Sequence, residues 1–457
     1  MKLIYNIKDK PKFGQLIVFA IQQLLAIMAA TLVVPVIVGN GMSPAAALFG
    51  AGAGTLVYIL FTKASSPVFL GSSFAFLGSM AAAFAGAATM EVGYLGLILG
   101  AIFAGLVYVV IALVVKFVGV GWINKLMPTV VIGPTVAVIG LSLAGNAVGD
   151  ILKGNVTGEA GEVLAAPFVC LLCGLVTLAV TMLCATFGKK MIRLIPFIMG
   201  ILAGYAVAAI FTVIGNVAGI DALKVLNFGA FSVLVEGGIG LHTFFSVPEF
   251  TFFTALGGFG EISGSYIASI AVAYIPVAFV VFAEHIADHK NISTIIEKDL
   301  LEEPGLHRTL LGDGVGSMVG AFFGGCPNTT YGESVGCVAI TGNASVITIF
   351  AAAVGALIIS CLNPFVAFVN SIPSCVMGGV CMALYGFIAV SGLKMVQKVD
   401  LEQNRNLFVV SVILIAGIGG LTLTFGKVTL TSVACALILG ILANIMLSPA
   451  DKKPEEK

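Results

Sequence analysis

The chain has 457 residues, of which 59% are hydrophobic and only 10% are charged, and its mean hydropathy is +1.12. Soluble domains carry about 25% charged residues, so this composition excludes a soluble protein and indicates an integral membrane protein. The formal net charge is zero, which leaves no basic surface for nucleic acid. Apolar runs of about 20 residues recur, as in membrane-spanning helices, whereas a β-barrel would need short alternating runs.

The apolar runs predict an all-α protein with 14 transmembrane segments. The first seven cover residues 15–38, 44–62, 67–86, 93–117, 125–148, 165–187 and 191–217. After a Gly- and Phe-rich connection, the second seven cover residues 264–289, 308–324, 330–342, 345–369, 372–394, 404–425 and 428–448. With this count, all but three of the 22 Lys and Arg residues fall on one side, so a multi-pass protein of the cytoplasmic (inner) membrane with both termini in the cytoplasm is expected.

An internal repeat relates the two halves. Pro, Val and Gly recur at a constant offset of 245 residues: Pro128 and Pro373, Val131 and Val376, Gly133 and Gly378. Seven segments are an odd number, so the second half would enter the membrane from the opposite face. The pattern therefore predicts the 7+7 inverted repeat typical of secondary transporters.

Two of the predicted segments have an unusual start. The segments at 67–86 and 330–342 follow Pro67 and Pro327 and pass through Gly, Ser, Thr or Asn before they become apolar. Half-helices that follow extended backbone explain this composition, because non-helical backbone at membrane depth must be satisfied by protein or by a cavity. We expect segments 3 and 10 to be discontinuous and to direct helix N-termini at a central site for a flat, polar solute.

Two acids lie deepest in the apolar segments, Glu284 and Glu333, and a membrane-embedded carboxylate normally faces a cavity. Asp288 shares a helix face with Glu284, and His285 and His289 share the neighbouring face. One interpretation is that one acid accepts hydrogen bonds from substrate N–H groups while another takes and releases a proton. In the alternative, Asp288 and His289 are the hydrated cytoplasmic end of the helix.

Other polar residues of the chain have different expected roles. Asp313 follows a charged loop and is expected at the membrane interface. The cluster of Glu, His, Asp and His at 284–289 could in principle hold a metal in an intramembrane enzyme, but it spans two helix faces and lacks H-E-x-x-H. Cys170 and Cys173 form a C-x-x-C motif that fits helix packing better than metal binding. No metal or cofactor is predicted.

Several motifs together resemble one family, the nucleobase/ascorbate transporters (nucleobase:cation symporter family 2), and within it the bacterial uracil permeases. They are QQLLAIMAATLVVP, LGSSFAF, FAEHIADH, KDLLEEPGLHRTLLGDG and NTTYGESVGCVAITG. The resemblance implies proton-driven uracil uptake and a core domain (residues 1–120 and 263–370) beside a gate domain (residues 121–262 and 371–457). A homodimer through the gate domain is also expected, and xanthine or uric acid is the alternative substrate.

The resemblance also implies site residues. Phe74, Glu284, Gly332 and Glu333 would bind the substrate, and we expect Glu284 or Asp288 to handle the proton. The expected supporting residues are Gln23, Ser73, His285, Tyr331 and Ser334. The sequence departs from the family pattern at three of these positions: Ser334 replaces the usual Asn, Asp288 stands where some uracil permeases have His, and Gln23 replaces a common His.

Overall fold

The structure is a computed structural model that describes residues 3–119, 121–122, 128–158, 162–189, 191–232, 234–236, 238–425 and 428–448. The first half of the chain runs through α1 Phe13–Val38, α2 Pro44–Phe61, β1 Leu70–Ser72, η1 Phe74–Phe76, α3 Leu77–Ala85, α4 Met90–Val118, α6 Thr129–Ser142, α7 Ala144–Asp150, α8 Pro167–Phe187, α9 Met191–Leu194 and α10 Pro196–Ala218. A connection of short helices follows: η2 Asp221–Leu223, α11 Gly229–Ser232, α12 Leu241–Phe244, α13 Thr251–Ala255 and η3 Leu256–Gly260.

The second half of the chain begins with the longest described helix, α14 Gly264–Ile296, and the turn η4 Leu301–Gly305. It continues through α15 Leu306–Gly324, β2 Asn328–Thr330, α16 Gly332–Thr341, α17 Val346–Ser360, α18 Asn363–Ser371, α19 Ser374–Val396, α20 Asn404–Ile418, β3 Leu423–Phe425, β4 Val428–Leu430 and α21 Ser432–Leu447. Within the described ranges, eight helices are long and apolar enough to cross a membrane: α1, α2, α4, α6 together with α7, α8, α10, α14 and α19. The protein is therefore a multi-pass helical membrane protein.

Most predicted segments coincide with helices, and the differences have local causes. The segment predicted at 345–369 is broken between α17 and α18, where Pro364 occupies the first turn of the new helix. The segment predicted at 404–425 ends at Ile418, because Gly419 and Gly420 precede a β3–β4 hairpin. Helix α14 runs seven residues beyond the predicted end at residue 289. The predicted start at residue 125 and several lysines used in the charge count, such as Lys427, lie outside the described residues.

Two short strands meet in the middle of the fold. β1 and β2 pair antiparallel, with Leu70 opposite Thr330 and Ser72 opposite Asn328, and every residue of both strands is buried. A helix begins directly after each strand, η1 continuing into α3 after β1 and α16 after β2. Extended backbone therefore precedes both half-helices, as the Pro-, Gly- and Ser-rich starts of these segments predict.

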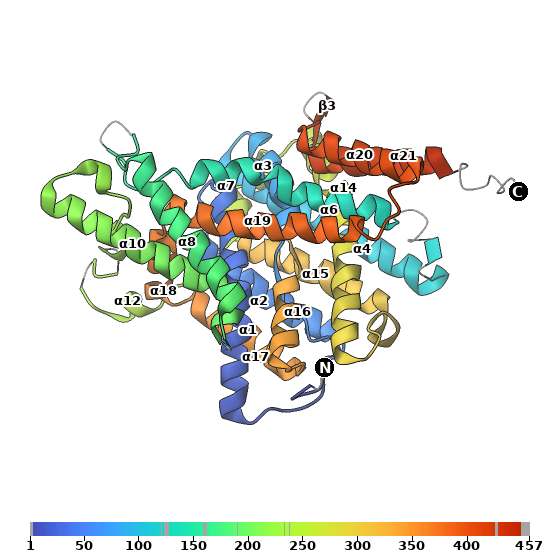
Figure 1. The fold of residues 1–457 in the computed structure, drawn as a ribbon, viewed down its shortest axis with the longest axis horizontal. Helices are drawn as coiled ribbons and strands as arrows, with labels where there is room; N and C mark the ends of the chain where they lie inside the picture. The colour runs from blue at the N-terminus through green and yellow to red at the C-terminus, as the bar shows by residue number, and fades with distance from the viewer. Residues whose placement is uncertain are drawn as a thin grey trace, which may run out of the picture.

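The helices pack as two neighbouring groups. Helices α1, α2, α4, α14, α15, α16 and α17 surround the paired strands, and α6, α8, α10, α19, α20 and α21 pack mainly on one another. In Figure 1, α6, α19, α20 and α21 cross the upper part of the molecule at a steep angle to α1, α14 and α16, and α8 and α10 lie to the left. The strands and the start of α16 thus lie where the two groups meet.

Glycines bring α2 and α15 into close contact. Gly50 and Gly54 on α2 face Gly320 and Gly316 on α15, and a Cβ atom built at Gly50 would come within 2.4 Å of the Gly320 carbonyl oxygen. Small residues spaced four apart let membrane helices approach closely and gain van der Waals contact. This packing supports the buried side of β1 and β2.

We therefore predict that Gly50→Ala lowers the thermal unfolding midpoint of the detergent-purified protein, because a methyl group there forces two backbones apart at a cost of about 1–3 kcal/mol. The matched control is Gly386→Ala in α19, where an added Cβ meets nothing within 4 Å. An unchanged midpoint for Gly50→Ala would contradict this description of the contact.

Candidate substrate-binding site

A cavity of about 370 Å³ lies where the paired strands, α14 and α16 face α6, α10 and α19. This volume falls within the usual range for small-molecule sites, roughly 300–1,000 Å³. Its lining comes from both helix groups: Ser73, Phe74, Ala75, Val136, Ile139, Phe197, Glu284, Ala287, Asp288, Asn291, Thr329, Tyr331, Gly332, Glu333, Leu384, Phe387, Ile388, Ser391 and Met395. A solute in this cavity would therefore touch both groups of helices at once.

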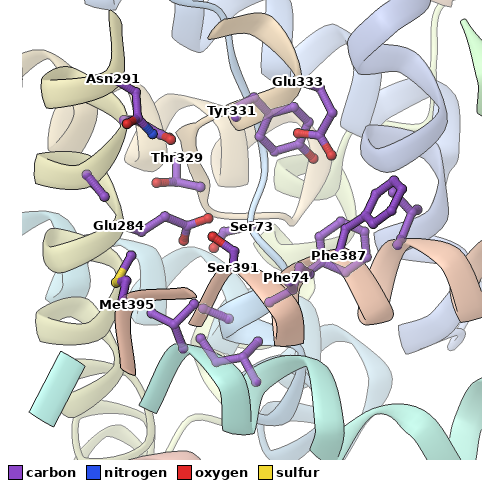
Figure 2. Close-up of a pocket in the computed structure, with 18 of the residues that line it drawn as sticks. Ser73, Phe74, Glu284, Asn291, Thr329, Tyr331, Glu333, Phe387, Ser391 and Met395 are labelled. Atoms are coloured by element: carbon purple, nitrogen blue, oxygen red, sulfur yellow. The ribbon is translucent and has the colours of Figure 1, made fainter. Parts of the chain in front are cut away.

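Two glutamates from different helices enter this cavity. Glu284 extends from α14 toward the middle of the cavity, near Ser73 and Ser391, and Glu333 projects from the first turn of α16 beside Tyr331 (Figure 2). Both side chains are half-buried. Because carboxylates only accept hydrogen bonds when ionised, the pair presents acceptors to a solute that carries N–H donors.

The same wall also offers donors. Helix α16 begins at Gly332 without a side-chain cap, so its first-turn N–H groups have no partner within the helix. Gly332 has no side chain to cover them and is exposed to the cavity. The buried hydroxyls of Ser73 and Thr329 have no hydrogen-bond partner among the described residues. Carbonyl oxygens of a solute would find donors here, strengthened by the positive end of the helix dipole.

The opposite wall of the cavity is apolar apart from Ser391 on α19. It is formed by Val136, Ile139, Phe197, Leu384, Phe387, Ile388 and Met395. Phe74 lies between the two walls, with its ring edge-on to Tyr385 at a centroid distance of 5.9 Å. A polar edge and an apolar face together suit a flat ring that carries hydrogen-bonding groups around its rim.

Three of the predicted site residues lie outside the lining, behind the polar wall. The Gln23 side-chain amide donates to the Ser334 hydroxyl, which also accepts from the backbone N–H of Phe69 at 2.9 Å. Both side chains are buried. They connect α1, the start of α16 and the strand region, and so support the site without facing the cavity. His285, the third, lies on the side of α14 that packs on α15.

The expectation that Asp313 lies at the membrane interface is wrong. Asp313 is 1% exposed, and its Oδ2 lies 2.7 Å from Nδ1 of His285. Helix α15 begins seven residues earlier, at Leu306, which carries Asp313 into the bundle. The charged loop before it suggested an interfacial position, and its partner 28 residues upstream could not be identified from sequence spacing.

The hydrated-end alternative for Asp288 and His289 is also wrong. Asp288 is 7% exposed and His289 is fully buried. Asp288 accepts a hydrogen bond from the Thr330 hydroxyl at 2.9 Å, and the imidazole of His289 lies 2.7 Å from the hydroxyl of Tyr58. Because α14 continues to Ile296, both residues lie inside the helix and not at its end.

Sequence reasoning missed most of the apolar wall. Its residues come from helices far apart in the chain, and an apolar residue in an apolar segment gives no separate signal. Thr329 and Asn291 were missed as well, although both are polar residues close to the predicted acids and could have been suspected. No group of three or more His, Cys, Asp or Glu in the described part of the chain is arranged to hold a metal ion. Cys170 and Cys173 are buried in α8.

A multi-pass helical protein whose broken helices line a solute-sized cavity between two helix groups has the form of a membrane transporter. The chain matches the profile of the Permease family over residues 14–425 and belongs to that family. It is thus a transporter and not an enzyme, which excludes the intramembrane enzyme considered above.

The relatives and structural neighbours agree with this class. The chain is 38% identical over 460 residues to the "Uracil permease" of Bacillus subtilis, covering 99% of this chain and 97% of that protein. It is 34% identical over 454 residues to the "Uracil permease" of Escherichia coli strain K12, covering 99% and 96%. The transmembrane domain of the cyanobacterial bicarbonate transporter BicA is similar in fold, with a TM-score of 0.63 at 15% identity over 96% of this chain and 100% of that one.

Proposed function

We propose that this protein is a proton-coupled symporter that imports uracil across the cytoplasmic membrane by alternating access. The observation that carries the proposal is that Glu284 and Glu333 enter one cavity beside an uncapped helix start. The proteins named uracil permease that align along nearly the whole chain support this choice of substrate.

The chemistry of the base fits the two walls. Uracil has two N–H donors and two carbonyl acceptors on the rim of a flat ring. The carboxylates of Glu284 and Glu333 would accept from the N–H groups, and the backbone of Gly332 and Glu333 would donate to a carbonyl. The ring of Phe74 would lie against the face of the base. A site built on such hydrogen bonds discriminates sharply against analogues that lack them.

A proton would travel with the base for an electrostatic reason. An ionised carboxylate costs several kcal/mol at membrane depth, so Glu284 needs a substrate, a proton or both while its domain moves. Asp288, one turn further along α14 in the same lining, is the second candidate proton carrier. Accumulation driven by the inward proton gradient follows if one of these acids is protonated only when the base is bound.

The proposed architecture has 14 segments in a 7+7 inverted repeat. A core domain (residues 1–120 and 263–370) would move against a gate domain (residues 121–262 and 371–457). The antiparallel pairing of β1 with β2, one from each half, supports the repeat, and the two groups of packed helices support the division. The proposed homodimer would form through the gate domain.

The cavity lining supports a cytoplasmic opening in this conformation. Asn291 and Met395 lie near the C-terminal ends of α14 and α19, next to Lys290 and Lys394. These lysines belong to the side that the charge distribution assigns to the cytoplasm. A cavity that opens to the cytoplasmic side, where both termini are also proposed to lie, would release the base into the cell from the conformation described here.

Uracil uptake should depend on the proton gradient. Purified protein in proteoliposomes should accumulate labelled uracil when an inward proton gradient is imposed, and a protonophore should abolish the accumulation. Glu284→Gln should remove gradient-driven accumulation and weaken uracil binding about ten- to a hundred-fold, because a charged acceptor is replaced by a neutral amide.

The matched control is Glu302→Gln, which changes an exposed glutamate in the loop after α14 and should leave uptake unchanged. Wild-type uptake that is independent of the gradient would refute the coupling. A Glu284→Gln variant with normal accumulation would remove this residue from the mechanism.

Xanthine or uric acid transport is the second candidate, because Asp288 stands where some uracil permeases of the family have His. We predict that unlabelled uracil competes with labelled uracil at a concentration at least ten-fold lower than xanthine or uric acid does. The reverse order in the same proteoliposomes would identify a purine permease instead. A control with thymidine, whose sugar blocks one ring N–H, should show little competition.

A further inference from the structure

Hydrogen bonds at the edge of the cavity and behind it connect α14 to β2 and to α15. The Thr330 hydroxyl on β2 donates to Oδ2 of Asp288 at 2.9 Å. On α15, Oδ2 of Asp313 lies 2.7 Å from Nδ1 of His285. His285 and Asp288 both belong to α14. All four residues are buried.

The Thr309 hydroxyl determines how many protons the His285–Asp313 pair carries. The Thr309 hydroxyl donates to the Leu306 carbonyl at 3.1 Å, so it must accept from Nε2–H of His285, 3.0 Å away. Nδ1 of His285 and Oδ2 of Asp313 then share one proton. The pair is neutral whether the proton lies on the imidazole or on the carboxyl group, which suits a site shielded from water.

A second histidine, His289, makes contacts on the same side of α14 as His285. Nδ1 of His289 lies 2.8 Å from the His285 carbonyl oxygen, and its Nε2 lies 2.7 Å from the Tyr58 hydroxyl on α2, which donates to the Ser66 hydroxyl. The two imidazole rings stack with a centroid distance of 4.0 Å. The side of α14 that faces away from the cavity is thus fixed to both α2 and α15.

We propose that Thr330 is a positioning residue that sets the separation of the two glutamates. Thr330 precedes Glu333 by three residues, and Asp288 follows Glu284 by four. The bond from Thr330 to Asp288 therefore joins α14, which carries Glu284, to β2, which leads directly into the helix that carries Glu333. A shift of α14 relative to β2 would move Glu284 but not Glu333. This inference rests on the proposed function, because the separation matters only if one solute binds both carboxylates.

The experiment compares Thr330→Val with Thr330→Ser. Valine has nearly the same shape and suits a strand, but it cannot donate to Asp288, whereas serine can. Thr330→Val should raise the KM for uracil about ten-fold with Vmax within two-fold of wild type, and Thr330→Ser should restore the KM to within about two-fold. A residue with only a structural role would lower the amount of active protein, and so Vmax, at unchanged KM.

The control is Thr181→Val in α8, which removes a buried hydroxyl that donates only within its own helix, to the Thr177 carbonyl, and should leave the KM unchanged. If Thr330→Val is not recovered folded, Thr330→Ala removes the same hydroxyl without adding a methyl group. If the wild-type protein takes up uracil but Thr330→Val has an unchanged KM, the inference is wrong while the proposed function stands. The absence of uracil uptake by the wild-type protein overturns the proposed function. A KM that is raised equally in the valine and serine variants also contradicts the inference.

Discussion

Backbone N–H and C=O groups inside a membrane must find hydrogen-bond partners within the protein, and this constraint organises the centre of the molecule. The pairing of β1 with β2 satisfies it for two non-helical stretches at once. Two further bonds extend the pairing at its ends: the Ser73 N–H donates to the Pro327 carbonyl, and the Tyr331 N–H donates to the Phe69 carbonyl. Because each strand leads directly into a helix, this backbone pairing also brings the start of η1 and the start of α16 to the same cavity.

The positions of Glu284 and Glu333 in the cavity depend on this arrangement of strands and helices. Glu333 lies in the first turn of α16, where the helix dipole favours a negative charge. Glu284 comes from a continuous helix that is bonded to β2 through Thr330 and Asp288 and, on its other side, to α15 and α2. The cavity therefore combines one carboxylate that moves with the strands and one that belongs to a long helix, and the contacts behind the cavity keep the two together.

The sequence predicted what depends on composition and local pattern. Runs of apolar residues indicated most helices to within a few positions, and the Pro- and Gly-rich starts after Pro67 and Pro327 indicated extended backbone. Two acids that line the cavity, Glu284 and Glu333, could be identified because a carboxylate in an apolar segment is rare and costly.

What the sequence did not predict depends on contacts between distant segments. The apolar wall of the cavity is formed by helices α6, α10 and α19, whose side chains resemble any lipid-facing residue in sequence. The buried position of Asp313 depends on His285 from another helix. The family resemblance predicted Phe74 and Gly332 as site residues, and both line the cavity. Residue spacing alone would not have distinguished them from other Phe and Gly residues of the chain.

The most direct test of the account is an experimental structure of the protein with bound uracil. We expect a planar ring in the cavity, with its N–H groups within hydrogen-bonding distance of the carboxylates of Glu284 and Glu333 and its face against Phe74. A ring bound elsewhere, or one in this cavity with both carboxylates turned away from it, would show that the two glutamates do not bind the base.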